Sequence, residues 1–198
     1  MTVICEVLGV PLEDEPRFHH WIETALDAWE YGPETASEEF RSRLAGGNRA
    51  LQEFGRFAVE LYDRYARQPG PGMLSAMVHE DGPEGRMPKG LLTSNAVLLL
   101  FAGHETTVNL IAHGVLTLLR HPDELDLERR DNQHLGFSQG IHFCFGAPLA
   151  RLEVQVAVGE FFRRVQNPRL VEDPPPYRRN QIFRGPRHVL VDIDGVRD

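Results

Sequence analysis

The sequence predicts a mainly α-helical protein with a small β component. An amphipathic stripe covers residues 48–67, an apolar run without proline covers residues 89–120, and an apolar helical face follows Pro148. Only the tail, with its apolar run at residues 188–193, favours a small terminal strand or hairpin. Because 41% of the 198 residues are hydrophobic and 25% charged, we expect a single globular domain spanning residues 1–198.

The N-terminal half favours three helices. Residues 14–31 carry aromatic and aliphatic side chains at helical spacing, until Gly32 and Pro33 end the pattern. The amphipathic stripe at residues 48–67 predicts the second helix, which stops before the helix-breaking sequence Pro69-Gly-Pro-Gly72. A short helix is expected at residues 73–79, followed by a polar loop that reaches Pro88.

The second half favours one very long helix and one of ordinary length. At about 1.5 Å per residue, a helix over residues 89–120 would be about 45 Å long, and its apolar character predicts burial along most of its length. His121-Pro122 ends this helix, and residues 123–143 have the irregular pattern of a loop. Pro148 suits the first turn of the last helix, which continues to residues 166–168.

Charge and cysteine content exclude several classes of function. With 29 acidic against 21 basic residues the formal charge is −8, so we expect no nucleic-acid partner and no anionic membrane surface. The most apolar stretch, residues 96–102, is too short to cross a bilayer. Cys5 and Cys144 are too few for a disulfide framework or a multi-cysteine zinc site, and the N-terminus has no basic leader. We therefore expect a cytoplasmic protein.

The most informative stretch surrounds Cys144. Gly140 and Gly146 flank this cysteine, which lies four residues before a helix-starting proline, where backbone N–H groups and the helix dipole stabilise a thiolate. The glycines leave room for a flat ligand beside the sulfur. A buried structural cysteine is the alternative. A zinc site of His134, His142 and Cys144 is possible by ligand type but has no evident fourth ligand.

The sequence Phe137-Ser-Gln-Gly-Ile-His-Phe-Cys-Phe-Gly-Ala-Pro-Leu-Ala-Arg151 resembles the heme-ligand loop of bacterial cytochromes P450. It matches Phe-x-x-Gly-x-His-x-Cys-x-Gly-x-x-x-Ala-Arg at every fixed position. The resemblance implies thiolate-ligated heme b, with Cys144 as the axial ligand of the iron. It also implies that Phe137 packs beside the sulfur and that His142 points toward a heme propionate.

A polar break interrupts the long apolar helix at Ala102-Gly-His-Glu-Thr-Thr107. A glycine beside an acid and two hydroxyls lowers helix stability, although such groups are often satisfied by hydrogen bonds in a core. The string resembles the distal helix of cytochromes P450. The resemblance implies that Ala102 and Gly103 let this long central helix lie close to heme. It also makes Thr106 the hydroxyl that supports proton delivery above the iron and Glu105 the neighbouring acid.

Further similarity at residues 3–14 and 126–137 extends the resemblance over nearly the whole chain, but the chain matches only about half of a family member. The resemblance therefore implies a partial cytochrome P450 fold that lacks the N-terminal part. The resemblance also implies that the helix carrying the family's Glu-x-x-Arg is absent, because residues 120–129 pass directly from the end of the distal helix to the approach to the cysteine loop. Three strings with this spacing lie elsewhere and are expected to be exposed helical pairs: Glu38 with Arg41, Glu53 with Arg56, and Glu160 with Arg163.

Three hypotheses about function follow. The first is a heme-thiolate monooxygenase that inserts one oxygen atom of O₂ into a small organic substrate with electrons from a ferredoxin-like donor. The second is a homologue without this activity, heme-free or poorly heme-loaded, that acts as a binding or auxiliary protein or a non-oxidative catalyst. The third is a half-protein completed by homodimerisation or by another chain. Docking of an acidic donor would use Arg151, Arg163 and Arg164, for which solvated helix arginines are the alternative.

Overall fold

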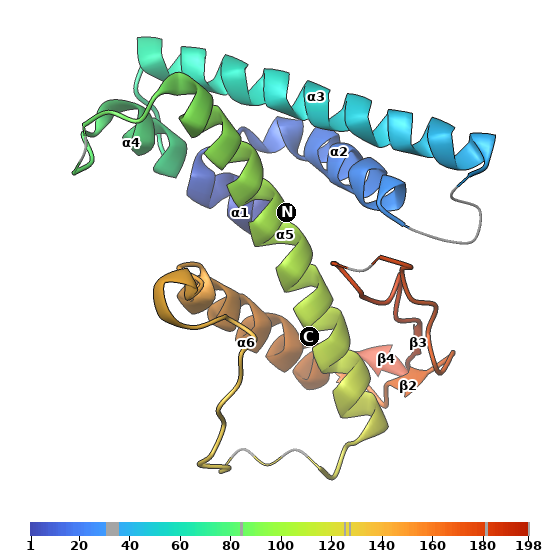
Figure 1. The fold of residues 1–198 in the computed structure, drawn as a ribbon. Helices are drawn as coiled ribbons and strands as arrows, with labels where there is room; N and C mark the ends of the chain where they lie inside the picture. Colours follow the sequence, from blue (N-terminus) through green and yellow to red (C-terminus); the bar gives the residue numbers. More distant parts are fainter. Residues whose placement is uncertain (31–35, 84, 125, 127, 181, 198) are drawn as a thin grey trace. The chain divides into compact units, whose positions relative to one another are not determined.

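The computed structural model describes residues 1–30, 36–83, 85–124, 126, 128–180 and 182–197 (Figure 1). Most of the described residues are helical, as predicted. The helices are α1 Thr2–Leu8, α2 Glu15–Ala28, α3 Glu38–Arg67, α4 Met73–His79, α5 Lys89–Arg120 and α6 Ala147–Arg164, with 3₁₀ turns at Leu12–Asp14 and Gly140–His142. The four strands have two residues each: β1 Val165–Gln166, β2 Arg169–Leu170, β3 Val191–Asp192 and β4 Gly195–Val196. The small β component is thus confirmed.

The chain forms two compact units. The first contains Met1–Glu105 together with Arg179–Phe183, and the second contains Thr106–Arg178 together with Arg184–Asp198. The boundary falls inside α5, so this helix contributes its N-terminal part to one unit and its C-terminal part to the other. The organisation of residues 1–198 as a single domain remains a prediction.

In the first unit α2 lies alongside α3 (Figure 1), and an aromatic cluster holds the two helices together. Phe18 is fully buried, and its ring centroid lies 5.4 Å from that of Trp21, 5.3 Å from Phe54 and 5.0 Å from Phe57. Edge-to-face contacts of this kind add to the hydrophobic stabilisation of buried rings. The apolar stripes of the two predicted helices therefore face one another.

Two helix starts differ from the prediction. α3 begins at Glu38, ten residues before the expected start, because the Ser37 hydroxyl accepts a hydrogen bond from the Phe40 N–H at 3.1 Å and caps the helix. Within α3, a Cβ at Gly47 would lie 2.3 Å from the Cβ of Ala28, so the close crossing of α2 requires this glycine. α1 was not predicted, since seven residues are too few for a clear period.

The other helix bounds agree closely with the sequence. α4 and α5 have the predicted limits, and α6 begins at Ala147 with Pro148 in its first turn. α2 ends at Ala28, while Gly32 and Pro33 lie outside the described residues. The expected burial of most of α5 is wrong: Leu91, Leu98, Val108 and Leu110 are exposed, so only part of its circumference is covered.

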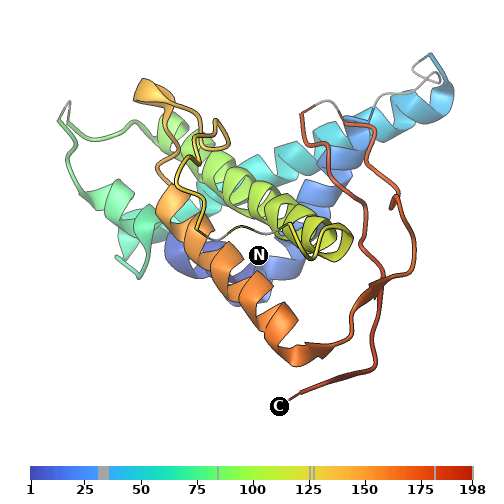
Figure 2. The ribbon, with the colours of Figure 1, turned by 90° about the horizontal axis from the view of Figure 1, so that it is seen from below.

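In the second unit, the C-terminal part of α5 lies beside α6 (Figure 2), since a Cβ at Gly114 would contact the Val158 side chain at 3.6 Å. Two short antiparallel ladders follow, β1 with β4 and β2 with β3. The predicted terminal strand at residues 188–193 is present only at Val191–Asp192. Arg169 joins the ladders, donating to Asp192 at 3.0 Å and to Asp194 at 2.7 Å.

The segment between β2 and β3 leaves the second unit and returns to it. Backbone hydrogen bonds from Arg178 to Gly185 and from Arg187 to Pro176 hold its two sides together. Its tip, Arg179–Phe183, belongs to the first unit, where the Phe183 ring lies 5.4 Å from that of Phe101. The first unit therefore contains two segments that are far apart in the sequence.

Candidate functional site

The loop before α6 places the Cys144 sulfur at the N-terminus of that helix. A Cβ built on Gly146, the N-cap residue of α6, would lie 3.7 Å from the Cys144 sulfur. The Cys144 N–H donates to the Phe137 carbonyl at 2.9 Å, and the Ala147 N–H donates to the Cys144 carbonyl at 3.2 Å. The positive end of the α6 dipole therefore lies near the sulfur, where it stabilises negative charge.

Positive backbone φ angles shape the same loop. Gly140 has a φ of 66°, a conformation that glycine adopts without strain, and its Cβ position is open, with no atom within 4 Å. Ser138, with a φ of 61°, adopts the left-handed conformation without being glycine, and sequence reasoning did not predict it. The Gly140 carbonyl accepts a hydrogen bond from the Phe143 N–H at 3.1 Å and closes the 3₁₀ turn that contains His142.

Phe137, predicted to pack beside the sulfur, is half-buried at the start of the loop. The Arg151 guanidinium of α6 lies over its ring, 4.9 Å from the centroid, and the His134 ring lies 6.0 Å away. A cation over an aromatic face is attracted by the ring quadrupole. Arg151 therefore links the two ends of the motif.

The two cysteines have different environments, and neither forms a disulfide. Cys5 is fully buried, and burial, helped by the nearby Glu15 carboxylate, raises the pKa of its thiol to about 11. Cys144 is only partly buried. Of the two, Cys144 alone is accessible to a ligand.

Residues 102–107, which resemble the distal helix of cytochromes P450, lie within the continuous helix α5. Some of the predicted residues in this segment are exposed and others are buried. Ala102 and Thr106, four residues apart, are exposed together with Leu98 and Leu110, so these four form one outward stripe. Glu105 is buried instead, as are His104 and Thr107. Adjacent helical residues differ by about 100° around the axis, which explains why Glu105 and Thr106 do not share a face.

His104 was not among the predicted functional residues. Its ring is buried 6.1 Å from that of His19. Burial, together with the positive charges of the N-terminus and His19, lowers the pKa of His104 to about 4. The imidazole is therefore neutral at neutral pH.

The strings with Glu-x-x-Arg spacing behave as ordinary helical residues. Glu160 and Arg163 form the expected exposed pair, with nitrogen–oxygen distances of 2.5 and 3.0 Å. Glu53 accepts instead from the Trp21 indole at 3.1 Å, and Arg56 donates to the Gln52 carbonyl. Between α5 and the 3₁₀ turn at Gly140, the described residues contain no helix that could carry such a pair.

The residues around Cys144 fit a flat apolar cofactor. Ile141, Phe143 and Phe145 are 97%, 51% and 74% exposed, so apolar surface surrounds a partly exposed sulfur. One thiolate is sufficient to hold heme iron. Within the described part of the chain, no three His, Cys, Asp or Glu side chains are grouped to hold a metal ion, so His134, His142 and Cys144 do not form a joint site.

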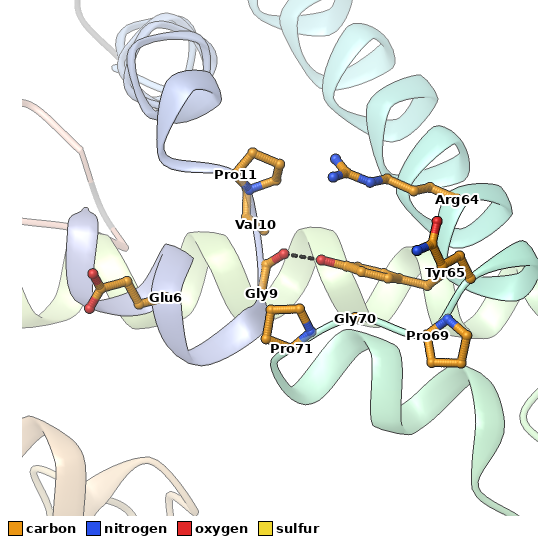
Figure 3. A pocket seen from close by; sticks show the side chains of 10 residues that line it. Glu6, Gly9, Val10, Pro11, Arg64, Tyr65, Pro69, Gly70 and Pro71 are labelled. Carbon is orange, nitrogen blue, oxygen red and sulfur yellow. Dashed lines mark hydrogen bonds between the residues drawn. The ribbon is translucent and has the colours of Figure 1, made fainter.

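Among the described residues, cavities occur elsewhere, and the two considered next are not lined by a predicted site residue. The first, of about 520 Å³, lies in the first unit between the end of α1 and the end of α3 (Figure 3). Across it, the Tyr65 hydroxyl donates a hydrogen bond to the Gly9 carbonyl. The second, of about 610 Å³, lies in the second unit beside Arg120 and Pro168. Sequence patterns gave no indication of either cavity.

Solved structures share this fold. The cytochrome P450 PksS from Bacillus subtilis superposes with a TM-score of 0.80 at 26% identity, over 97% of this chain and 65% of that one. CYP164A2 from Mycobacterium smegmatis superposes with a TM-score of 0.75 at 27% identity, over 96% and 66%. The chain therefore has part of a cytochrome P450 fold.

Curated relatives agree in sequence. The 6-deoxyerythronolide B hydroxylase of Saccharopolyspora erythraea is 30% identical over 98% of this chain and 63% of its own length. The cytochrome P450 monooxygenase PikC of Streptomyces venezuelae is 30% identical over 93% and 59%. No family model matches. The chain is homologous to the bacterial cytochromes P450 over almost its whole length.

The chain spans about 60% of the length of these two relatives. The match to the hydroxylase extends over 266 positions, more than the chain contains, so the relative has internal residues without a counterpart here. The location of a skipped segment at residues 120–129 remains a prediction. Within the described ranges, no helix combines the length and apolar character needed to cross a membrane.

Proposed function

We propose that this chain is a heme-thiolate monooxygenase that hydroxylates a small organic substrate with O₂ and electrons from a ferredoxin-like donor. The observation that carries the proposal is the Cys144 sulfur beside the N-cap of α6, within a loop that matches the P450 motif. Homology to P450 hydroxylases supports the reaction class.

In this proposal, Cys144 binds the iron as a thiolate and donates electron density to it. The α6 dipole stabilises the negative sulfur, and the hydrogen bond from the Cys144 N–H to Phe137 fixes the loop around it. The exposed Ile141, Phe143 and Phe145 supply apolar contact, and His142 is the proposed donor to a propionate. When bound, the heme supplies the iron that activates dioxygen.

Thr106 is the proposed proton carrier. Its hydroxyl projects from the outward stripe of α5 and both donates and accepts hydrogen bonds, so it can hold a water molecule and pass on a proton. Ala102, one turn earlier on the same stripe, leaves space beside it. Glu105 is the proposed acid, although its burial on another side of the helix separates it from the Thr106 surface.

The proposed electron donor approaches the side of the molecule that carries the cysteine loop. Arg151, Arg163 and Arg164 are the candidate contacts, and each also has an intramolecular partner. Arg151 lies over Phe137, Arg163 pairs with Glu160, and Arg164 donates to the Arg197 carbonyl at 3.3 Å. The Glu160 carboxylate offsets the charge of Arg163, whereas the partners of Arg151 and Arg164 are uncharged, so Arg151 and Arg164 are the better candidates for meeting an acidic donor. A cytoplasmic location is part of the same proposal.

A heme-free or poorly heme-loaded binding protein is the second candidate. The apolar side chains around Cys144 are exposed, and the short connection between α5 and the cysteine loop has no described helix to cover them. A partly covered heme would bind weakly, because water competes for its propionates and apolar edge. Completion by a second copy or another chain would restore this cover.

The test is hemin titration followed by reduction and exposure to carbon monoxide. We expect a strongly red-shifted Soret band in the parent, its loss in Cys144→Ala, and its retention in Cys5→Ala, which removes the buried thiol. Far-ultraviolet circular dichroism checks that both variants stay helical. A band that survives in Cys144→Ala refutes the ligand assignment, and absence of heme uptake by the parent supports the heme-free candidate.

A further inference from the structure

Gly103 lies on the side of α5 that faces the core of the first unit. Ala96 and Leu100 precede it on this side, and both are almost completely buried. Their spacing of four and then three residues is that of one helix face. Leu98, Ala102 and Thr106 form the outward stripe on a different side. The two stripes together define how α5 is rotated about its own axis.

Ile4 of α1 occupies the space that a side chain at Gly103 would need. A Cβ on Gly103 would lie 2.6 Å from the Cδ1 atom of Ile4 and 2.8 Å from its Cγ1 atom. Both distances are shorter than carbon atoms tolerate without displacement. Gly103 lies inside a regular helix and has no positive φ, so backbone conformation does not require glycine here. A side chain here would instead have to displace the Ile4 side chain from α5.

We propose that Gly103 is a positioning residue. Because it has no side chain, Ile4 can pack directly against α5. This contact fixes the rotation of α5 about its own axis, and in that rotation Ala102 and Thr106 face outward. The importance of that rotation rests on the proposed function, in which Thr106 carries a proton. The rotation itself is a property of the polypeptide and is measurable without heme.

A matched pair of glycines tests the packing. Alanine is favoured over glycine within a helix by about fivefold in the folding equilibrium constant. Gly55 of α3 has open space at its Cβ position, so Gly55→Ala should increase that constant by about this factor. Gly103→Ala should decrease it, and in an Ile4→Ala background the same change should become favourable. Urea unfolding measures the folding equilibrium constant of the parent and of the four variants: Gly55→Ala, Gly103→Ala, Ile4→Ala, and Ile4→Ala combined with Gly103→Ala. Stabilisation by Gly103→Ala in the presence of Ile4 overturns the proposal.

Thiol accessibility tests the rotation, which a purely structural glycine would not alter. Thr106→Cys and Thr107→Cys are compared in a Cys144→Ala background, where only buried Cys5 remains. Thr106 is exposed and Thr107 buried, so a thiol at position 106 should react at least about tenfold faster with maleimide.

Gly103→Ala should reduce that ratio of rates severalfold, and Ile4→Ala should restore it. An unchanged ratio, with folding confirmed by circular dichroism, refutes the positioning role. Since no step uses heme, a parent protein that fails to bind hemin would refute the proposed function and leave this result standing.

Discussion

His104 should make folding sensitive to mild acid. The pKa of its imidazole is about 4 in the folded protein, against an ordinary value of 6.5, so between these values the unfolded chain binds a proton that the folded chain excludes. The stabilisation is complete above pH 6.5 and is lost as the pH falls toward 4. For these pKa values, the free energy of unfolding should fall by about 1.3 kcal/mol between pH 7.5 and 5.5.

Urea unfolding at the two pH values measures this loss. His104→Gln removes the titrating ring, so its unfolding free energy should change less with pH than that of the parent, whatever its absolute stability. His20→Gln is the control, because His20 is an exposed residue of α2 whose ring stays in water on folding. A parent-like pH dependence in His104→Gln would show that burial of this imidazole is not the cause.

Three further predictions concern the site and the core. In heme-loaded protein, Thr106→Ala should lower product formed per O₂ consumed severalfold while consumption continues; an unchanged ratio rules out its proton-carrying role. Phe18→Ala should cost about 3–5 kcal/mol of unfolding free energy, measured in urea, because the ring is fully buried against three others; a loss below about 1 kcal/mol would contradict this packing. Glu160→Gln should leave the urea midpoint unchanged, since the pair with Arg163 is exposed, and a clear shift would assign that pair a structural role.

Local signals predicted most of the helices. Proline, glycine and apolar periodicity set the limits of α4 and α5, because those signals act within a few residues. The early start of α3 depends on the Ser37 cap, a local signal outside the apolar stripe that predicted this helix. The approach of Ala28 to Gly47, by contrast, is a contact that no local pattern contains. The strand pairs join residues 165–166 to 195–196, and two-residue strands are too short for a detectable period.

The sequence predicted which loop and which helix form the candidate site. The motif around Cys144 specified a thiol at a helix N-terminus, and the structure puts the sulfur beside Gly146. The sequence of residues 102–107 did not show which of these side chains lie on the same side of α5. Thr106 faces outward while Glu105 and His104 are buried, because the packing of α1 and of the first unit's core sets the rotation of α5. That rotation depends on Ile4, far away in sequence.

The tip of the hairpin between β2 and β3 makes this chain difficult to divide. Residues 179–183 belong to the same compact unit as the first 105 residues, and Phe183 packs against Phe101 in that unit. A gene fragment ending at Glu105 would therefore lose an aromatic partner of its own core. The complementary fragment would carry Phe183 without its aromatic partner Phe101. Expression of separate halves should use co-produced fragments, and tags or fusion junctions belong at the ends of the chain rather than within this hairpin.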